Sequence, residues 1–389
     1  MRKGWEYKKL GEVCEVVTGT TPKTNIPEYW GKGHYWVTPA ELSDATIFID
    51  KTERQITDEA LSKTKLRLLP VGTVLLSSRA PIGKVAIANA EMYCNQGFKN
   101  CICSEAIYNK YLFYFLRVKK DYLNSLGRGA TFKEISKSIV ESIKIPLPPK
   151  STQLAIVSEL DKINELIRLK KEQLKDFDNL AQSLFYEMFG DPVENEKGWE
   201  VKKLNDICDV RDGTHDSPKY LQNSEYILIT SKNIVNGRID FENVNYISEE
   251  DYIKINKRSK VDNGDIIMPM IGTIGNPIIA HIDETHKFCI KNVALIKFLA
   301  DSTVNNIFIV NLMRCSSFNN YLLNQNKGGT QKFVALGAIR KLPIPLPPLT
   351  LQRLFAQRIE QIEREKSEVQ KSIQDLETLL ASRMQYWFE

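Results

Sequence analysis

Residues 4–20 read GWEYKKLGEVCEVVTGT, and residues 198–214 read GWEVKKLNDICDVRDGT. Ten of the seventeen aligned positions are identical. A second shared segment, IPLPP, stands at residues 145–149 and again at residues 344–348. A repeat of about 195 residues is far longer than the unit of a solenoid, so the 389-residue chain is a duplication of whole domains in tandem.

Between these ends the two halves share shorter matches in the same order. They pair 71–76 with 263–268, 80–83 with 272–275, 129–133 with 328–332, and Gln153 with Gln352. The interiors have diverged more than the edges, and residues 21–67 and 215–260 have little in common. The sequence therefore predicts two copies of one fold whose binding specificities need not be the same.

The composition is that of an ordinary globular protein, with 42% hydrophobic and 26% charged residues. No apolar run approaches the ~18 residues of a membrane span, and the first residues lack the apolar stretch of a signal peptide. The seven cysteines are scattered without scaffold spacing, which predicts free thiols in a reducing compartment. We therefore expect a cytoplasmic protein with no membrane partner.

The net charge of +5 is unevenly distributed along the chain. Residues 1–150 carry 23 Lys and Arg against 15 Asp and Glu, and residues 198–348 carry 18 against 16. The two remaining segments are slightly acidic. This asymmetry permits a polyanionic partner such as nucleic acid, although many unrelated domains reach the same charge.

A long helical pattern follows each proline-rich segment, because proline ends the element before it. Apolar residues recur there in alternating steps of three and four, interrupted by Lys170, Lys366 and Arg383. Such heptads favour coiled-coil pairing of the two helices over the alternative that each lies on its own domain. The residues expected in the interface are Ile156, Leu160, Ile163, Ile167, Leu174, Phe177, Leu184, Ile359, Ile362, Val369, Ile373, Leu376 and Leu380.

The globular parts combine strand and helix patterns. Short apolar runs bounded by Gly, Pro and Asn predict strands at residues 73–77, 85–88 and 266–270, and residues 108–117 and 306–314 predict helices. The predicted class is α+β, with two similar domains in tandem and a long helix after each. The predicted boundaries are 1–149 for the first domain, 150–190 for its helix, 191–348 for the second domain and 349–389 for the C-terminal helix.

The sequence contains no recognisable catalytic or metal site. The stretch SRAPIGKV at residues 78–85 lacks the first glycine of a P-loop and the hydroxyl residue after its lysine. His281 and His286 stand five apart without the glutamate of a zincin, and Cys101 and Cys103 have no second ligand pair. We expect no catalytic residue, no metal and no cofactor in this chain.

Polar loops with Gly, Thr and basic residues occupy equivalent places in both halves. Small residues let backbone N–H groups approach phosphates, and Arg, Lys, Thr, Gln and Asn contact phosphates and base edges. The alternative is that these segments are only tight turns. The candidate DNA-binding residues are Thr20, Thr21, Lys23, Ser78, Arg79, Lys84, Arg128, Lys133, Thr214, His215, Lys219, Thr273, Lys327, Thr330, Gln331 and Lys332.

The chain resembles the specificity (S) subunit of a Type I restriction–modification system. The resemblance rests on the duplicated GWE-x-KKL opening, the SRAPIGK stretch at 78–84, the IPLPP-xxx-Gln segments and the long helix after each. It implies two target-recognition domains, each reading one half of a split DNA site, joined by an antiparallel coiled coil with pseudo-two-fold symmetry. It also implies two adenine-methyltransferase (M) subunits, and restriction (R) subunits when present, as partners. S-adenosylmethionine, ATP and Mg²⁺ would belong to those partners.

Two other classes of protein stay open at this point. A self-contained methyltransferase or nuclease would need the nucleotide and catalytic motifs that we do not find. A coiled-coil scaffold would bridge other proteins and show no preference for any DNA sequence.

Overall fold

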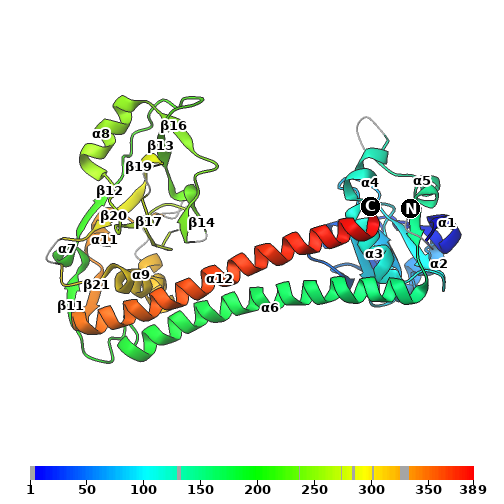
Figure 1. Cartoon of the computed structure of the whole chain (residues 1–389), viewed down its shortest axis with the longest axis horizontal. Coiled ribbons are helices and arrows are strands. Elements are labelled where there is room, and N and C mark those ends of the chain that lie inside the picture. The colour runs from blue at the N-terminus through cyan, green and yellow to red at the C-terminus, as the bar shows by residue number, and fades with distance from the viewer. Residues whose placement is uncertain are drawn as a thin grey trace. The chain divides into compact units, whose positions relative to one another are not determined.

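The computed structural model describes residues 5–128, 133–235, 237–272, 274–282, 285–299, 302–324 and 333–389. They form two compact units, and the long helices α6 (Lys150–Phe189) and α12 (Leu349–Phe388) contribute to both (Figure 1). The first unit holds residues 1–171 and 371–389, and the second holds residues 172–370. Each unit thus contains one globular repeat, half of α6 and half of α12.

The first unit contains two main sheets and short helices. Its five-stranded sheet has the order β2 (Cys14–Thr18), β9 (Lys99–Cys103), β6 (Val74–Leu76), β7 (Val85–Ala88) and β4 (Phe48–Ile49). Its three-stranded sheet has the order β5 (Gln55–Ile56), β3 (Trp30–Val37) and β8 (Tyr93–Cys94). The helices are α1 (Leu10–Val13), α2 (Asp58–Lys63), α3 (Asn109–Val118), α4 (Lys120–Leu126) and α5 (Lys137–Ser142). The buried aromatic face of α3 fills the space between the larger sheet and the long helices.

The second unit repeats this plan with altered details. Its four-stranded sheet has the order β12 (Asp209–Asp212), β20 (Val293–Lys297), β17 (Ile266–Pro269) and β18 (Ile278–Ile279). The three-stranded sheet has the order β16 (Asn245–Ile247), β13 (Tyr226–Ile229) and β19 (Lys287–Ile290), and β14 (Ile234–Val235) pairs with β15 (Arg238–Ile239). The helices are α7 (Leu204–Ile207), α8 (Glu249–Ser259), α9 (Asn306–Arg314), α10 (Ser316–Asn324) and α11 (Leu336–Arg340). The predicted α+β class, with two similar domains in tandem and a long helix after each, is confirmed.

The segments that are most alike between the repeats pair with each other. β1 (Glu6–Lys9) lies antiparallel to β10 (Lys144–Leu147), and β11 (Glu200–Lys203) lies antiparallel to β21 (Pro343–Leu346). The GWE-x-KK opening and the IPLPP segment therefore close the two ends of one globular domain onto each other.

The duplicated glutamine after each proline-rich segment is fully buried and connects the start of the long helix to a neighbouring loop. Gln153 Oε1 accepts the backbone N–H of Tyr108 at 2.8 Å, and its Nε2 donates to the carbonyls of Ala106 and Pro148, each at 3.0 Å. Gln352 makes the same pattern of contacts in the second unit. A buried amide with all these bonds satisfied fixes the start of the long helix against the loop that leads into α3 or α9.

The two long helices pair in opposite directions. In the first unit the beginning of α6 meets the end of α12, where Arg383 forms an ion pair with Glu159 and Phe388 is buried in the same core as Leu160. In the second unit the end of α6 meets the beginning of α12, where Phe185 and Phe355 pack ring against ring at 5.6 Å. Lys366, one of the predicted interruptions, is paired with Asp178 of α6 at 2.8 Å.

The interface differs from the heptad expectation along the second half of α6. Ile156, Leu160, Ile163 and Ile167 are buried, but Leu174, Phe177 and Leu184 are only half-buried, as are Leu376 and Leu380 of α12. The fully buried side chains at the end of α6 are Phe185 and Phe189. This end of the helix packs on a globular core that contains Phe308, so its buried side chains follow steps of four residues rather than the heptad repeat. Ile359, Ile362, Val369 and Ile373 of α12 are buried, as expected.

Candidate nucleic-acid interface

The duplicated Gly-Thr pair begins a loop that packs tightly on the neighbouring backbone. A Cβ on Gly19 would lie 1.9 Å from the carbonyl oxygen of Asn95, and a Cβ on Gly213 would lie 2.4 Å from that of Ile290. The next residue is held in the same way in both units, because its N–H donates to a carbonyl of the three-stranded sheet. The glycine is therefore a structural requirement, and the loop after it is presented at an equivalent place in each domain.

Two tryptophans support this loop in the first unit. The Nε1–H of Trp30 donates to the carbonyl of Lys23 at 3.2 Å, and the Nε1–H of Trp36 donates to the carbonyl of Thr20 at 3.2 Å. Both indoles use their only polar atom on the loop backbone. Sequence reasoning missed them, although a pair of tryptophans six residues apart in a polar segment was a visible signal.

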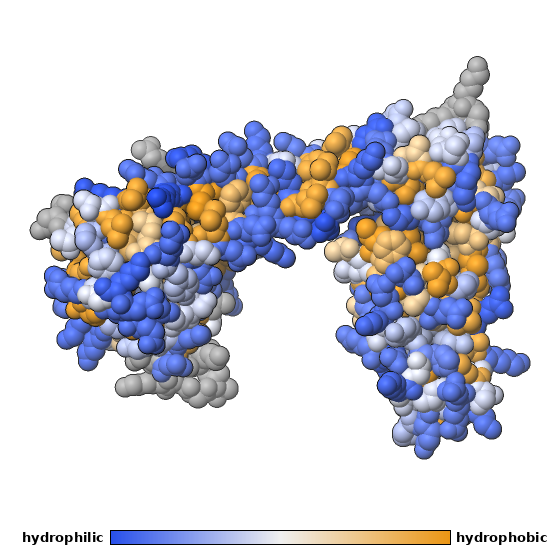
Figure 2. All heavy atoms as spheres, turned by 90° about the horizontal axis from the view of Figure 1, so that it is seen from below, coloured by the Kyte–Doolittle hydropathy of each residue, from blue (hydrophilic) through white to orange (hydrophobic). Residues whose placement is uncertain are grey.

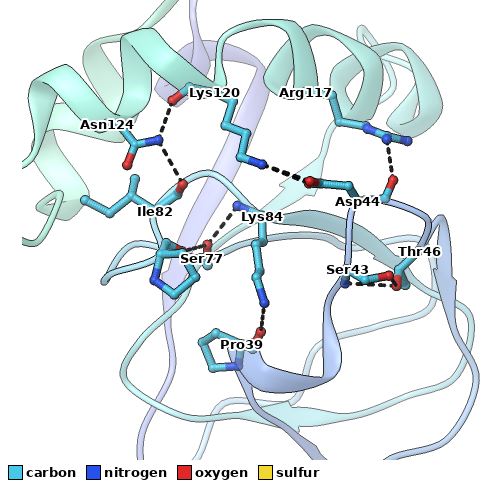
Figure 3. Close-up of polar contacts among 11 residues, drawn as sticks. Pro39, Ser43, Asp44, Thr46, Ser77, Ile82, Lys84, Arg117, Lys120 and Asn124 are labelled. Atoms are coloured by element: carbon cyan, nitrogen blue, oxygen red, sulfur yellow. Dashed lines mark hydrogen bonds and ion pairs between the residues drawn. The ribbon is translucent and has the colours of Figure 1, made fainter. Parts of the chain in front are cut away.

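The loop between β6 and β7 is held from within the domain (Figure 3). The backbone N–H of Lys84 donates to the Ser77 hydroxyl at 2.9 Å, and its ammonium group donates to the carbonyl of Pro39 at 3.1 Å. Asn124 of α4 donates to the carbonyl of Ile82 at 3.2 Å. Lys84 is half-buried, so in this conformation its charge supports the loop from inside.

The neighbouring Ser78 and Arg79 belong to a charged cluster around Glu134. Arg79 and the buried Lys99 each lie 3.0 Å from the Glu134 carboxylate, and Lys99 also donates to the buried Ser78 hydroxyl at 3.4 Å. Partial burial opposes ionisation of Glu134, but the hydrogen bonds from Lys99 and Arg79 outweigh it and lower the pKa of this carboxyl group below its usual value. Ser78 and Arg79 thus connect the loop between β6 and β7 to the segment between α4 and α5 that contains Glu134.

At the matching place in the second unit, the charged residues Arg79 and Glu134 are replaced by the apolar residues Ile271 and Phe333. The backbone bridge between Arg79 and Glu134 has its counterpart in the bridge between Ile271 and Phe333. This backbone bridge is therefore shared by the two units, whereas the side chains that it carries are different.

A different polar cluster lies beside the Gly-Thr loop of the second unit. His215 has Nε2 2.8 Å from the buried Asp212 carboxylate and Nδ1 2.9 Å from Oδ1 of Asn292, and Arg258 is paired with the same carboxylate. The contacts with Asn292 and Asp212 raise the pKa of His215 above its usual value. Lys291, only 8% exposed, donates to the Ser217 hydroxyl at 2.6 Å. Sequence reasoning identified only His215 here.

The candidate residues are divided by exposure as follows. Thr20, Lys23, Arg79, Arg128, Lys133, His215 and Lys219 are exposed, Thr21, Lys84 and Thr214 are half-buried, and Ser78 is buried. Thr273, Lys327, Thr330, Gln331 and Lys332 lie outside the described residues. Within the part of the chain that the structure describes, Lys23, Lys133 and Lys219 make no ion pair, no group of side chains could hold a metal ion, and no helix is long and apolar enough to cross a membrane.

Known proteins share this duplicated arrangement. The family model of the Type I restriction modification DNA specificity domain matches residues 2–176 and again residues 196–378. The chain is 26% identical over 408 aligned residues to the MjaVIII specificity subunit of Methanocaldococcus jannaschii, which covers 97% of this chain and 92% of that subunit. It is 37% identical over 267 residues to the MjaIX specificity subunit of the same organism, covering 64% of this chain and 62% of that subunit.

Two solved structures have the same fold. The S subunit of M. genitalium aligns with a TM-score of 0.53 at 14% identity, over 99% of this chain and 96% of that one. A chain from a structure describing complex assembly and conformational transition of the type I R-M system aligns with a TM-score of 0.65 at 19% identity, over 99% and 97%. Two globular repeats of this type, each followed by a long helix, define the class of specificity subunits. The chain belongs to the family of Type I restriction–modification DNA specificity proteins, as its sequence predicted, and is by this membership a recognition subunit and not the catalytic one.

Proposed function

We propose that this chain selects the DNA sequence for a Type I restriction–modification complex, with each globular unit reading one half of a bipartite site. The observation that carries this proposal is that both units present the same Gly-Thr loop on the same framework but surround it with different side chains. Trp30 and Trp36 lie beside the loop in the first unit, and Asp212 and His215 lie beside it in the second. Two domains that share a fold but place different polar side chains around this loop are suited to recognise two different half-sites.

Non-specific affinity would come from exposed basic side chains near these loops. Lys23, Arg128 and Lys133 in the first unit, and Lys219 in the second, are exposed and suited to phosphate contacts. Lys327 and Lys332 are further candidates from the sequence. Because the second repeat carries little net charge, we propose that a methyltransferase subunit supplies much of the affinity for the second half of the DNA site.

The long helices are proposed to hold the two readers apart and to bind the methyltransferase subunits. Along the outer face of α6, Leu154, Leu166, Leu169 and Leu180 remain between 47% and 51% exposed. Figure 2 shows hydrophobic residues at the surface of the helical part of the molecule. Leu166 and Leu169, three residues apart on one helix, are proposed as part of a contact with a protein partner. Methylation and ATP-dependent cleavage would then belong to the M and R subunits with their S-adenosylmethionine, ATP and Mg²⁺, and the complex would act in the cytoplasm.

Selection of bound DNA from a random pool tests this function. The complex of the chain with its methyltransferase should enrich two short sequences separated by a gap of fixed length. Replacement of Lys23 by Gln should weaken binding to all sequences alike and reduce the dependence of log Kd on log salt by about one unit. Enrichment of no sequence would contradict DNA readout and favour a scaffold role.

A further inference from the structure

The first unit carries an arginine that is fixed on an aromatic platform beside the Gly-Thr loop. The rings of Trp30 and Trp36 meet edge to face, with centroids 4.8 Å apart. The guanidinium carbon of Arg54 lies 3.7 Å from the centroid of Trp30 and 5.3 Å from that of Trp36. Both tryptophans anchor the loop through their N–H groups, so the platform and the loop form one rigid surface.

The backbone of Arg54 is held as firmly as its side chain. Its carbonyl accepts the N–H of Trp36 at 3.2 Å and the hydroxyl of Thr52 at 2.6 Å. The next residue, Gln55, pairs with Tyr35 in the three-stranded sheet. Stacking on the indole restricts the side chain further, so much of the conformational entropy that a free arginine loses on binding has already been lost.

The hydrogen-bond donors of this guanidinium group are available. Arg54 is exposed and has no carboxylate within ion-pair distance among the residues that the structure describes. Stacking uses the face of the guanidinium plane and leaves the N–H groups at its edge. A planar fork of donors matches O6 and N7 of guanine in the major groove, and this is the commonest specific contact between arginine and DNA.

The fixed position of the Arg54 guanidinium suits readout of a base edge. Arg54 lines a hollow of about 410 Å³ together with Trp30, Lys32, Glu53 and Gln55. Glu53 adds an acidic acceptor of the kind that suits a base edge, whereas Gln55 Oε1 already accepts the backbone N–H of Gly33 at 2.8 Å. A phosphate contact would need only a mobile exposed cation, as Lys23 provides nearby.

The second unit lacks this platform. Leu228 occupies the place of Trp36 in the second unit. Trp36 precedes Val37, which pairs with Cys94 at the end of β8, and Leu228 precedes Ile229, which pairs with Ile290 at the end of β19. Between residues 172 and 370 the sequence contains only one tryptophan, Trp199, whose indole N–H is bonded to the carbonyl of Phe189. The platform is therefore specific to the first domain, as a determinant of one half-site must be.

We propose that Arg54, held on Trp30 and Trp36, reads a guanine in the half-site bound by the first unit. This inference rests on the proposed function. The test uses the assembled complex of the chain with its methyltransferase and DNA carrying the selected site, with each guanine of the first half-site replaced in turn by 7-deazaguanine, which lacks the N7 acceptor. The variants are Arg54→Ala, Arg54→Lys and, as a matched control, Arg67→Ala, which removes an exposed arginine paired with Glu15 in the same unit.

At one guanine position, the effect of 7-deazaguanine on binding affinity should depend on whether Arg54 is present. For the wild-type complex, 7-deazaguanine at that position should weaken binding, and Arg54→Ala should weaken binding to the unmodified site by about 5- to 150-fold. The analogue should have no additional effect on Arg54→Ala, Arg54→Lys should retain only part of the discrimination, and Arg67→Ala should keep it in full. Readout of the second half-site should be unchanged in every variant, which shows that the chain remains folded.

Two outcomes would overturn the inference while leaving the proposed function intact. If Arg54→Ala weakens binding to every sequence equally and lowers the salt slope by about one unit, Arg54 contacts a phosphate. If Arg54→Ala leaves binding unchanged, the platform lies outside the interface. A wild-type complex that enriches no split site would instead contradict the proposed function itself.

Discussion

Replacing Phe355 with alanine should destabilise the second unit by about 3–5 kcal/mol, because a fully buried phenylalanine leaves a cavity when it is removed. Phe355 is 0% exposed and packs against Phe185 and Phe189 of α6, with ring centroids 5.6 and 5.2 Å away. It therefore joins the beginning of α12 to the end of α6 and to the core of the domain. Hydrogen exchange of the backbone amides around Phe185 and Phe189 should accelerate by about tenfold for each ~1.4 kcal/mol of lost free energy, because the open fraction depends exponentially on the free energy of opening.

The adjacent residue on the same helix provides a matched control. Leu354 is 43% exposed, and Leu354→Ala should change stability by no more than about 0.5 kcal/mol. Hydrogen exchange is preferred to a single melting temperature because two compact units need not unfold in one step. Equal effects of the two substitutions would show that the aromatic cluster does not hold the helix ends together.

Inserting one heptad into both long helices should lengthen the gap in the recognised DNA site and leave both half-sites unchanged. The insertions would follow Glu172 in α6 and Lys371 in α12, between the ion pairs Lys171–Glu377 and Asp178–Lys366. Seven residues add about 10 Å at 1.5 Å per residue, and base pairs are spaced about 3.4 Å apart, so about three base pairs is the upper limit of the increase. The measurement is the gap in the DNA motif that the variant complex methylates.

An insertion in α6 alone serves as the control for this prediction. It would leave the residues of α6 on one side of the insertion out of register with α12 by one heptad, so that the Lys171–Glu377 and Asp178–Lys366 pairs could not both form, and we expect it to impair assembly rather than to extend the gap. A double-insertion complex that remains active with an unchanged gap would contradict the proposal that the helices set the spacing.

The division into two domains could be predicted from the sequence because the repeated segments mark the two ends of each domain. The matched openings and IPLPP segments identified two domains, and in each unit these segments pair with each other as a separate two-stranded sheet. The pattern at 85–88 is strand β7, and the pattern at 306–314 is helix α9. Periodicity alone did not identify Phe185 and Phe189, the most buried side chains near Leu184, because at that end of α6 the partner is a globular core.

The binding side chains were harder to predict because the residues that hold a loop are of the same types as those that contact DNA. Ser78 and Lys84 have the composition of a phosphate-binding loop, yet one is buried and the other donates to the Pro39 carbonyl. Arg54 stands in no recognisable motif. Its role depends on Trp30 and Trp36, which are brought beneath it by strand pairing that the local sequence does not encode.

The most direct test of the central claim is single-molecule mapping of methylated adenines in cells that carry this chain and in cells from which its gene has been deleted. The account predicts a split motif, methylated on both strands, that disappears on deletion and returns with the wild-type gene. The Arg54→Ala variant should alter one half of that motif only. A methylation pattern that is the same with and without the chain, although its methyltransferase is present and active, would contradict the account.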